Sequence, residues 1–364
     1  MKILIDAHVF DGKFQGSRTY IKGLYAEMIP LKKDWKFYFV AKNIDTLKEE
    51  FGEHPNVFFL PLKSTNKFSR LLLEFPKLIK KYEIDYSHFQ YISPPIKTGK
   101  NIVTTHDILF EEKRFKQFFP KKYRLINGFL FKRSARLADI LVTVSEYSKK
   151  KISELYKISK EEIIITPNAI NLNLYNLSND GYIKKKYGCK KYILFVSRIE
   201  PRKNHISILK AFKNLKLYEL GYELVFIGNQ DIDDVAYNTF INKNQDILKD
   251  KLHIFSNINE KELKKFYTNS AFVVYPSYAE GFGIPPLEAA VYKKKTLCSN
   301  ATAMAEFTFF KYIVDPYNQD EIEKSILQII EDNEDELNKI QEIILKKYHW
   351  KKSAEVLVEK LENH

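Results

Sequence analysis

The sequence predicts an α/β protein built from two doubly wound parallel-sheet domains that face each other across a cleft. Its 364 residues exceed the roughly 150 expected of one domain. Short apolar runs alternate with amphipathic segments, which is typical of parallel α/β sheets. The alternation is interrupted at residues 168–179, where five asparagines occur. With 45% hydrophobic and 29% charged residues, the composition excludes a disordered chain.

In the first half, the expected strands are apolar runs without a polar face, as in strands buried within a parallel sheet. They span residues 2–6, 35–40, 57–62, 102–105, 140–144 and 163–166. The segments between them carry apolar residues at helical spacing, which predicts helices at 17–28, 69–81, 121–137 and 145–156.

The second half repeats the alternation. Its expected strands are 192–196, 223–227, 253–255, 271–275 and 295–298. Its expected helices are 206–216, 236–249, 260–269, 285–292 and 319–333. The stretch 348–361 is amphipathic, so this helix either caps the second domain or crosses back to the first. We expect an N-terminal domain at 1–168, a C-terminal domain at 169–345, and a closing helix at 346–364 that crosses back.

Ligands of such sheets bind beyond the carboxyl ends of the strands, so functional residues are expected in the loops that follow strands. His106 directly follows the strand at 102–105, where it could bind a sugar hydroxyl or serve the structure alone. Arg198, Arg202 and Lys203 follow the strand at 192–196. Such cations suit a diphosphate, although a solvated basic loop would have the same composition.

The segment from Pro276 to Glu288 follows another strand. Gly281 and Gly283 allow the backbone to approach a ligand closely, and the next helix would present its N-terminus to a phosphate. Glu280 and Glu288 could serve two parts of one extended ligand. The alternative for the carboxylates is a helix cap and a solvated glutamate. Gly16 and Ser17 could similarly open the first helix toward an anion, or form a turn with a cap.

Several motifs are absent. The sequence has no Cys-x-x-Cys pair and no His-Glu-x-x-His, so we expect no metal-ligand cluster. It also lacks Gly-x-Gly-x-x-Gly and Gly-x-x-x-x-Gly-Lys-Ser/Thr, which counts against an NAD enzyme and a P-loop NTPase.

The net charge of +13 favours an anionic partner. Residues 63–136 hold 17 Lys and Arg against 6 Asp and Glu, interleaved with aromatic residues. Such a surface suits an anionic membrane or nucleic acid, whereas core packing explains many of the aromatics. No run approaches the ~18 apolar residues of a membrane span, and the chain has two cysteines. We expect a cytoplasmic protein, with peripheral contact to the inner face of the cytoplasmic membrane.

These segments together resemble the retaining GT-B glycosyltransferases of family 4, the glycosyl transferases group 1, in their mannosyltransferase-like branch. Arg198-x4-Lys203 and Glu280-x7-Glu288 are the most specific parts of the resemblance. Nearly the whole chain takes part, through segments 16–20, 105–107, 144–148, 167–168, 197–204, 280–288 and 349–350.

The chain departs from the family pattern at three positions. Arg18 stands where the first loop usually carries a second glycine, and Ala169 ends the usual Pro-Asn-Gly. Ser197 replaces the usual glycine before Arg198. These changes weaken any inference about the identity of the donor.

The resemblance implies a GT-B fold of two Rossmann-like domains and a role for each matching residue. Four would be catalytic: His106 beside the donor sugar, Glu280 on its hydroxyls, and Arg198 with Lys203 on the leaving diphosphate. Glu288 would bind the ribose, and the main chain at 255–258 would receive the base. The residues implied to bind the donor are Gly16, Ser197, Ile258, Phe282, Gly283, Ile284, Leu287 and Glu288.

The implied reaction is a retaining transfer of a hexose, mannose from GDP-mannose, to a glycan or lipid-linked oligosaccharide in surface polysaccharide synthesis. Neither a metal nor another cofactor would be required, and no nucleic acid would be bound. Four alternatives stay open: a UDP-hexose or UDP-HexNAc donor in the same fold, a non-catalytic GT-B-like binding subunit, a nucleic-acid binder, and a two-domain epimerase.

Overall fold

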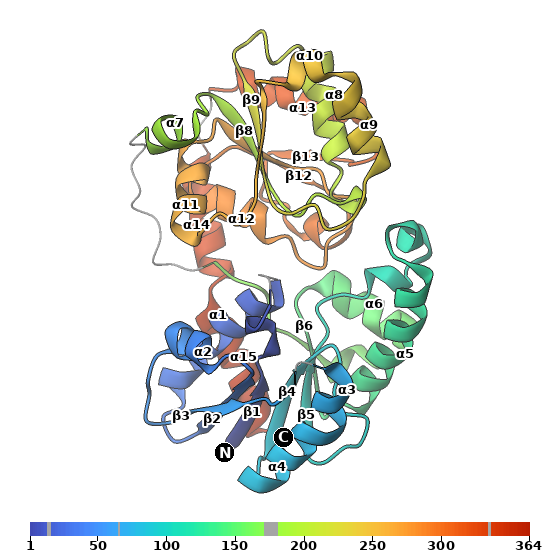
Figure 1. The fold of residues 1–364 in the computed structure, drawn as a ribbon, viewed down its shortest axis with the longest axis vertical. Coiled ribbons are helices and arrows are strands. Elements are labelled where there is room, and N and C mark those ends of the chain that lie inside the picture. The colour runs from blue at the N-terminus through green and yellow to red at the C-terminus, as the bar shows by residue number, and fades with distance from the viewer. Residues whose placement is uncertain (13–15, 65, 171–180, 334–335) are drawn as a thin grey trace. The chain divides into compact units, whose positions relative to one another are not determined.

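The computed structural model of the chain describes residues 1–12, 16–64, 66–170, 181–333 and 336–364. Contacts divide the chain into two compact units (Figure 1). We call Met1–Ala169 with His349–His364 the N-terminal domain, and Ile170–Tyr348 the C-terminal domain. Residues 171–179 of the expected linker lie outside the described residues.

The N-terminal domain contains a seven-stranded sheet of order β3-β2-β1-β4-β5-β6-β7. Every neighbouring pair is parallel. The strands are β1 (Lys2–Asp6), β2 (Lys36–Ala41), β3 (Val57–Pro61), β4 (Tyr86–Gln90), β5 (Lys100–Thr104), β6 (Ile140–Thr143) and β7 (Ile163–Ile165).

Helices cover both faces of this sheet (Figure 1). They are α1 (Gly16–Leu31), α2 (Ile44–Phe51), α3 (Lys67–Ser69), α4 (Phe75–Tyr82), α5 (Lys121–Leu137), α6 (Glu146–Tyr156) and α15 (Trp350–Glu362). The segment η2 (Arg70–Glu74) is π-helical and joins α3 to α4. Short 3-10 turns are η1 (His8–Phe10), η3 (Leu109–Glu111), η4 (Lys113–Phe118) and η5 (Lys160–Glu162). The expectation that Ser17 caps the first helix is wrong, because α1 already begins at Gly16.

The sequence did not predict β4 or α2. Three of the five side chains of β4 are polar, yet the whole strand is buried. Its His88 accepts or donates hydrogen bonds at both ring nitrogens, to the Tyr25 hydroxyl at 2.7 Å and to Thr104 Oγ1 at 2.7 Å. Partners of this kind remove the cost of burying polar groups, which an apolar pattern does not reveal.

Helix α15 packs against α1 in the N-terminal domain (Figure 1). The Trp350 ring centroid lies 6.0 Å from that of Tyr20, and Ser353 Oγ donates to the Pro167 carbonyl at 2.8 Å. A Cβ atom at Gly23 would lie 2.0 Å from the Trp350 ring. Glycine at this position of α1 therefore makes room for the indole.

The C-terminal domain contains a six-stranded parallel sheet of order β10-β9-β8-β11-β12-β13. Its strands are β8 (Tyr192–Val196), β9 (Glu223–Ile227), β10 (Leu252–Phe255), β11 (Phe272–Tyr275), β12 (Thr296–Ser299) and β13 (Tyr312–Val314).

Helices again lie on both faces. They are α7 (Tyr182–Tyr187), α8 (His205–Asn214), α9 (Val235–Lys243), α10 (Gln245–Leu248), α11 (Glu260–Asn269), α12 (Ile284–Val291), α13 (Gln319–Glu331) and α14 (Leu337–Lys347), with short turns η6 (Pro201–Lys203) and η7 (Thr302–Glu306). The sequence did not predict β13, α7 or α14, and it predicted one helix where α9 and α10 are two.

The strand order creates a topological switch point in each domain, where successive connections run in opposite directions. It lies between β1 and β4 in the N-terminal domain and between β8 and β11 in the C-terminal domain. The cation-rich loop follows β8, and the loop with Glu280 follows β11. Sheet topology thus brings these two loops to neighbouring strand ends. No described helix is both long and apolar enough to span a membrane.

Candidate active site

A buried ion pair joins the loops after β8 and β11. The Lys203 ammonium lies 2.6 Å from Glu280 Oε1, and Arg202 Nη1 lies 3.3 Å from Glu280 Oε2. Arg202 also pairs with Glu200 at 2.5 Å. We call Glu200, Arg202, Lys203 and Glu280 the charge cluster. Its side chains are about one-tenth exposed or less.

Two neutral residues complete the environment of the Glu280 carboxylate. The Ser277 hydroxyl donates to Oε1 at 2.7 Å, and the Tyr275 hydroxyl donates to the same oxygen at 3.2 Å. The Glu280 backbone N–H donates to Thr302 Oγ1 at 2.8 Å. These hydrogen-bond donors hold the Glu280 side chain in one orientation, which a carboxylate that positions a ligand requires.

The charges of the cluster decide the protonation of Glu280. Burial alone would raise its pKa, but Lys203 and Arg202 outweigh burial and lower the pKa to about 2. Burial and the neighbouring Arg202 lower the pKa of Lys203 despite the Glu280 carboxylate. At neutral pH Glu280 is therefore an ionised hydrogen-bond acceptor rather than a general acid.

Arg198 lies outside the buried cluster. Its side chain is 55% exposed and its Nη2 is 3.6 Å from Glu200 Oε2. A guanidinium held so loosely by one carboxylate can turn toward an incoming anion. The sequence predicted Arg198 and Lys203 for the same task, whereas the structure gives them different environments.

The glycine loop leads directly into α12. Gly283 has φ of 105°, and a Cβ atom there would lie 2.9 Å from Met304 Cγ. Phe282 is buried against Phe307 and Tyr348, with both ring centroids at 5.7 Å. Pro285 and Pro286 carry no N–H, so among the first four residues of α12 the backbone N–H groups of Ile284 and Leu287 are the ones available to an anion.

Glu288 and Leu287 lie on α12. Leu287 is fully buried, so its side chain serves the core. The Tyr267 hydroxyl donates to Glu288 Oε2 at 2.7 Å. Burial raises the pKa of Glu288, in contrast to Glu280. A carboxylate with one hydrogen-bond donor suits the vicinal hydroxyls of a ribose, which supply further donors.

The loop after β8 passes very close to the end of β9. An added Cβ at Gly228 would lie 2.0 Å from the Ser197 carbonyl oxygen, and the Ser197 N–H donates to the Ile227 carbonyl at 3.0 Å. Ser197 is thus held by its main chain. Ile258 follows β10 and packs partly against the core. Gly228 was not predicted from the sequence.

The remaining predicted residues lie in the N-terminal domain. His106 is 8% exposed and its Nε2 lies 2.6 Å from Gln90 Oε1. Tyr20 and Tyr91 lie at ring-centroid distances of 5.0 and 5.2 Å. Burial lowers the pKa of His106 to about 4, so the ring is neutral at pH 7. Gly16 is exposed at the first residue of α1, with open space around it.

The structure brings Lys203 and Glu280 into contact and places Arg198 beside their cluster. It adds Ser277, Tyr275 and Thr302, which were not predicted, and it pairs Glu280 with Arg202, which the sequence grouped with the cations of the loop after β8. Arg202 had a usable signal in the run of cations after β8. Thr302 had none, because its contact joins loops 22 residues apart.

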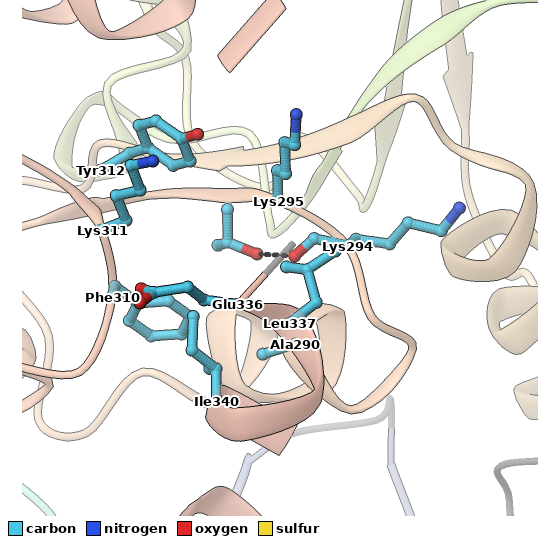
Figure 2. A pocket seen from close by; sticks show the side chains of 10 residues that line it. Ala290, Lys294, Lys295, Phe310, Lys311, Tyr312, Glu336, Leu337 and Ile340 are labelled. Carbon is cyan, nitrogen blue, oxygen red and sulfur yellow. Dashed lines mark hydrogen bonds between the residues drawn. The ribbon is translucent and has the colours of Figure 1, made fainter. Parts of the chain in front are cut away.

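A pocket elsewhere in the C-terminal domain lies among α12, β12 and α14 (Figure 2). None of the predicted site residues lines it. Its lysines already have partners: Lys294 Nζ donates to the Ser270 carbonyl at 2.9 Å, and Lys311 pairs with Asp332 at 2.7 Å. We assign it no ligand.

Two family models match consecutive parts of the chain. Glycosyltransferase Family 4 matches residues 16–174, and Glycosyl transferases group 1 matches residues 182–346. The chain thus carries a Glycosyltransferase Family 4 domain followed by a Glycosyl transferases group 1 domain. The second match contains the charge cluster and Glu288.

Curated relatives and solved structures agree with these two matches. The chain is 26% identical to O-antigen chain mannosyltransferase B of Escherichia coli, over 68% of the chain and 67% of the relative. It is 29% identical to O-antigen chain mannosyltransferase RfbU of Salmonella typhimurium, over 56% of the chain and 53% of the relative. The chain thus spans about two thirds and about half of these relatives.

A likeness to solved structures establishes the fold. Alr3699/HepE of Anabaena, in complex with UDP-glucose, is similar with a TM-score of 0.76 and 16% identity, over all of both chains. The chain has the GT-B fold with two Rossmann-like domains.

Proposed function

We propose that this chain is a retaining hexosyltransferase that takes mannose from GDP-mannose. The acceptor is a glycan or a lipid-linked oligosaccharide in the synthesis of a surface polysaccharide, such as lipopolysaccharide. The observation that carries the transferase proposal is the Lys203–Glu280 pair at the switch point of the C-terminal domain. The names of the two O-antigen mannosyltransferases support the sugar and the class of acceptor.

Each part of the donor has a matching group in the C-terminal domain. Glu280 accepts hydrogen bonds from sugar hydroxyls, since its low pKa keeps it ionised. The diphosphate binds Arg198 and the N-terminus of α12, and Lys203 supplies a further cation from the buried charge cluster. Glu288 binds the ribose. In the N-terminal domain, His106 is neutral and buried, and it is our candidate to hydrogen-bond a sugar hydroxyl without adding a charge.

In the proposed reaction, the bond from the anomeric carbon to the leaving phosphate oxygen breaks. The acceptor oxygen forms its bond to that carbon on the same face, and its proton passes to the departing phosphate oxygen. The products are the retained glycoside and a nucleoside diphosphate. Arg198 and Lys203 stabilise the negative charge that develops on the diphosphate. These cations take the part that a metal plays in other transferases, so the reaction needs no added metal.

Replacing Lys203 with alanine tests the assignment. Because the charge on the leaving group would lose a close cation, we expect transfer to fall about 10²- to 10³-fold. Lys210→Ala is the matched control, since Lys210 lies on the exposed side of α8. The measurement is nucleoside diphosphate release and product formation, with and without Mg²⁺. Full activity of Lys203→Ala, or transfer that requires Mg²⁺, contradicts the proposed mechanism.

A second donor class has its own support, because the structurally similar Alr3699/HepE of Anabaena was solved in complex with UDP-glucose. Thermal shifts with GDP, UDP, dTDP, CDP and ADP separate the two classes. A nucleotide at 100 times its Kd should stabilise the fold by about 2.7 kcal/mol. We expect a shift with GDP. A shift with UDP alone would replace mannose by a UDP-hexose or UDP-HexNAc, and no shift would favour a non-catalytic binding subunit.

The N-terminal domain offers a surface for an anionic membrane. On α5, Leu125, Ile126 and Phe129 are exposed by 75%, 48% and 70%. Exposed Lys121 and Lys122 precede them on the same helix. Apolar side chains with basic neighbours on one helix are suited to the headgroup region of a bilayer. Cytoplasmic location with peripheral attachment follows from this proposal.

Flotation with liposomes tests the attachment. We expect the chain to float with anionic vesicles at low salt and less with neutral ones. Phe129→Glu should reduce flotation. Val235→Glu is the control, since Val235 is equally exposed, at 70%, on α9 of the C-terminal domain. Equal flotation of Phe129→Glu and the wild type would exclude α5 as the contact.

A further inference from the structure

Three side chains with metal-ligating atoms meet at the amino ends of the strands of the C-terminal sheet. Cys189 precedes β8, Glu223 is the first residue of β9, and His253 is the second residue of β10. The Cys189 sulfur, a Glu223 carboxylate oxygen and a His253 ring nitrogen all lie within 4.8 Å of one another. No local spacing in the sequence predicts this group, because the sheet brings together Cys189 and His253, which are 64 positions apart.

The trio lies at the opposite end of the strands from the charge cluster. Strands of this sheet such as β9 have five residues, which corresponds to roughly 13–16 Å. Arg198 and Lys203 follow the carboxyl end of β8, whereas Cys189 precedes its amino end. The donor residues therefore do not account for the juxtaposition of thiol, carboxylate and imidazole.

Existing contacts orient all three groups. His253 Nε2 lies 3.1 Å from Glu223 Oε2, and the Lys190 N–H donates to the same oxygen at 3.2 Å. Cys189 Sγ lies 3.6 Å from the Tyr187 carbonyl oxygen. Cys189 is 1% exposed and Glu223 8%, while the His253 side chain is 26% exposed. The site is thus buried on two sides and open on the histidine side.

We propose that Cys189, Glu223 and His253 form a zinc-binding site with three protein ligands at the amino ends of β8, β9 and β10. A thiolate, an imidazole and a carboxylate are common zinc ligands. Zinc–ligand distances of about 2.0–2.3 Å require donor atoms roughly 3.2–3.8 Å apart, which small side-chain rotations achieve here. Water supplies the fourth ligand through the open histidine side. On binding, the Cys189 thiol proton is released to solvent as the zinc–sulfur bond forms.

Such an ion would join three strands at one edge of the sheet. Strand β10 is the terminal strand of the sheet and carries an exposed Ile254, so it has fewer packing partners than the central strands. Zinc binds the folded chain and not the separated ligands of the unfolded one, so it should raise the unfolding temperature.

Cobalt substitution tests the site in the full-length chain, with Co²⁺ as the probe and Zn²⁺ as competitor. A tetrahedral cobalt thiolate has a sulfur-to-metal charge-transfer band, and the chain has just two cysteines to produce one. We expect one Co²⁺ per chain with this band, displaced by Zn²⁺. Cys189→Ser should lose the band. Cys298→Ala should retain it, since Cys298 is a buried thiol outside the trio.

His253→Gln serves as a second variant, because its partly exposed position makes it the substitution least disturbing to the core. We expect at least a tenfold weaker Zn²⁺ affinity by calorimetry and no zinc-dependent rise in unfolding temperature. Absence of a thiolate band in the wild-type chain, its survival in Cys189→Ser, or unchanged zinc affinity in His253→Gln would overturn the proposal.

Discussion

Glu280 in the C-terminal domain and the histidines His88 and His106 in the N-terminal domain are buried in opposite ways. In the C-terminal domain, Glu280 is ionised and neutralised by Lys203 and Arg202. In the N-terminal domain, His88 and His106 are kept neutral by burial, which lowers their pKa values to about 3 and 4. The same cost of desolvation is met by pairing charges at Glu280 and by removing charge at His88 and His106.

The difference matches the parts of the proposed donor. The cations of the charge cluster can bind a diphosphate. Its negative charges would act in place of, or together with, those of Glu200 and Glu280. A neutral imidazole can share a hydrogen bond with a sugar hydroxyl. The C-terminal domain also buries a neutral imidazole at His205, where burial first and Lys203 second lower the pKa to about 3. The N-terminal domain likewise buries a paired carboxylate at Asp6, whose Oδ1 lies 2.8 Å from His8 Nδ1 and whose Oδ2 lies 3.8 Å from Arg70 Nε. The contrast is therefore between these individual groups, and the Glu280 carboxylate differs in having both Lys203 and Arg202 within 3.3 Å.

Removing that charge should have the largest effect on stability. Glu280→Gln leaves Lys203 and Arg202 buried with less compensation, so we expect a loss of about 3–5 kcal/mol in the free energy of unfolding. Urea denaturation measures it. Glu260→Gln is the control, because its pair with Lys264 at 2.9 Å is on the surface and should change stability by less than about 1 kcal/mol. Equal losses would show that Glu280 is not held by its buried pairs.

Acid should weaken the neutral network of the N-terminal domain. Below the ordinary histidine pKa of 6.5, the unfolded chain binds a proton on His88 that the folded chain does not, since its folded pKa is about 3. The contribution of the neutral ring to the free energy of unfolding is therefore fully present above pH 6.5. It is lost as the pH drops below 6.5, by about 1.4 kcal/mol per pH unit for each such histidine.

His88→Gln isolates this contribution, because glutamine can still hydrogen-bond Tyr25 and Thr104. Between pH 7 and pH 5 the variant should lose about 2 kcal/mol less than the wild type. Urea denaturation at both values measures the difference, with exposed His54→Gln as the control. A pH dependence unchanged by His88→Gln would mean that the folded chain protonates this ring.

The attachment of α15 to the N-terminal domain depends on Gly23. Gly23→Ala inserts a methyl group where the Trp350 ring lies, so we expect a loss of about 1–3 kcal/mol from overpacking. Gly16→Ala on the same helix meets open space and should be neutral or slightly stabilising. Thermal unfolding compares the two, and an unchanged unfolding temperature for Gly23→Ala would contradict the packing of α15 on α1.

The smallest effect on stability is expected at Arg198. Because its side chain is mostly exposed, Arg198→Ala should change the free energy of unfolding by about 0.5 kcal/mol or less. The nucleotide-dependent thermal shift should nevertheless fall, because the diphosphate loses a cation. A variant that keeps the full shift would remove Arg198 from the donor site and leave the charge cluster as the anion-binding element.

Sequence reasoning located the site residues better than it located their roles. Lys203 and Glu280 were singled out because each follows a strand, and the parallel sheet brings such loops together. Their direct ion pair could not be predicted, since it depends on the order of β8 and β11. Thr302 escaped because its contact joins loops 22 residues apart. Ser277 lies three residues before Glu280 in the same loop, so its contact is local and was missed.

The sequence by itself determined the alternation of strands and helices, because apolar periodicity reports which faces are buried. It also determined which loops carry cations and carboxylates. Only the tertiary structure decided that polar β4 is a central strand, because its partners come from α1 and β5. It likewise decided that α15 packs on α1 and that Cys189, Glu223 and His253 meet. Each of these depends on contacts between distant residues, which no local pattern records.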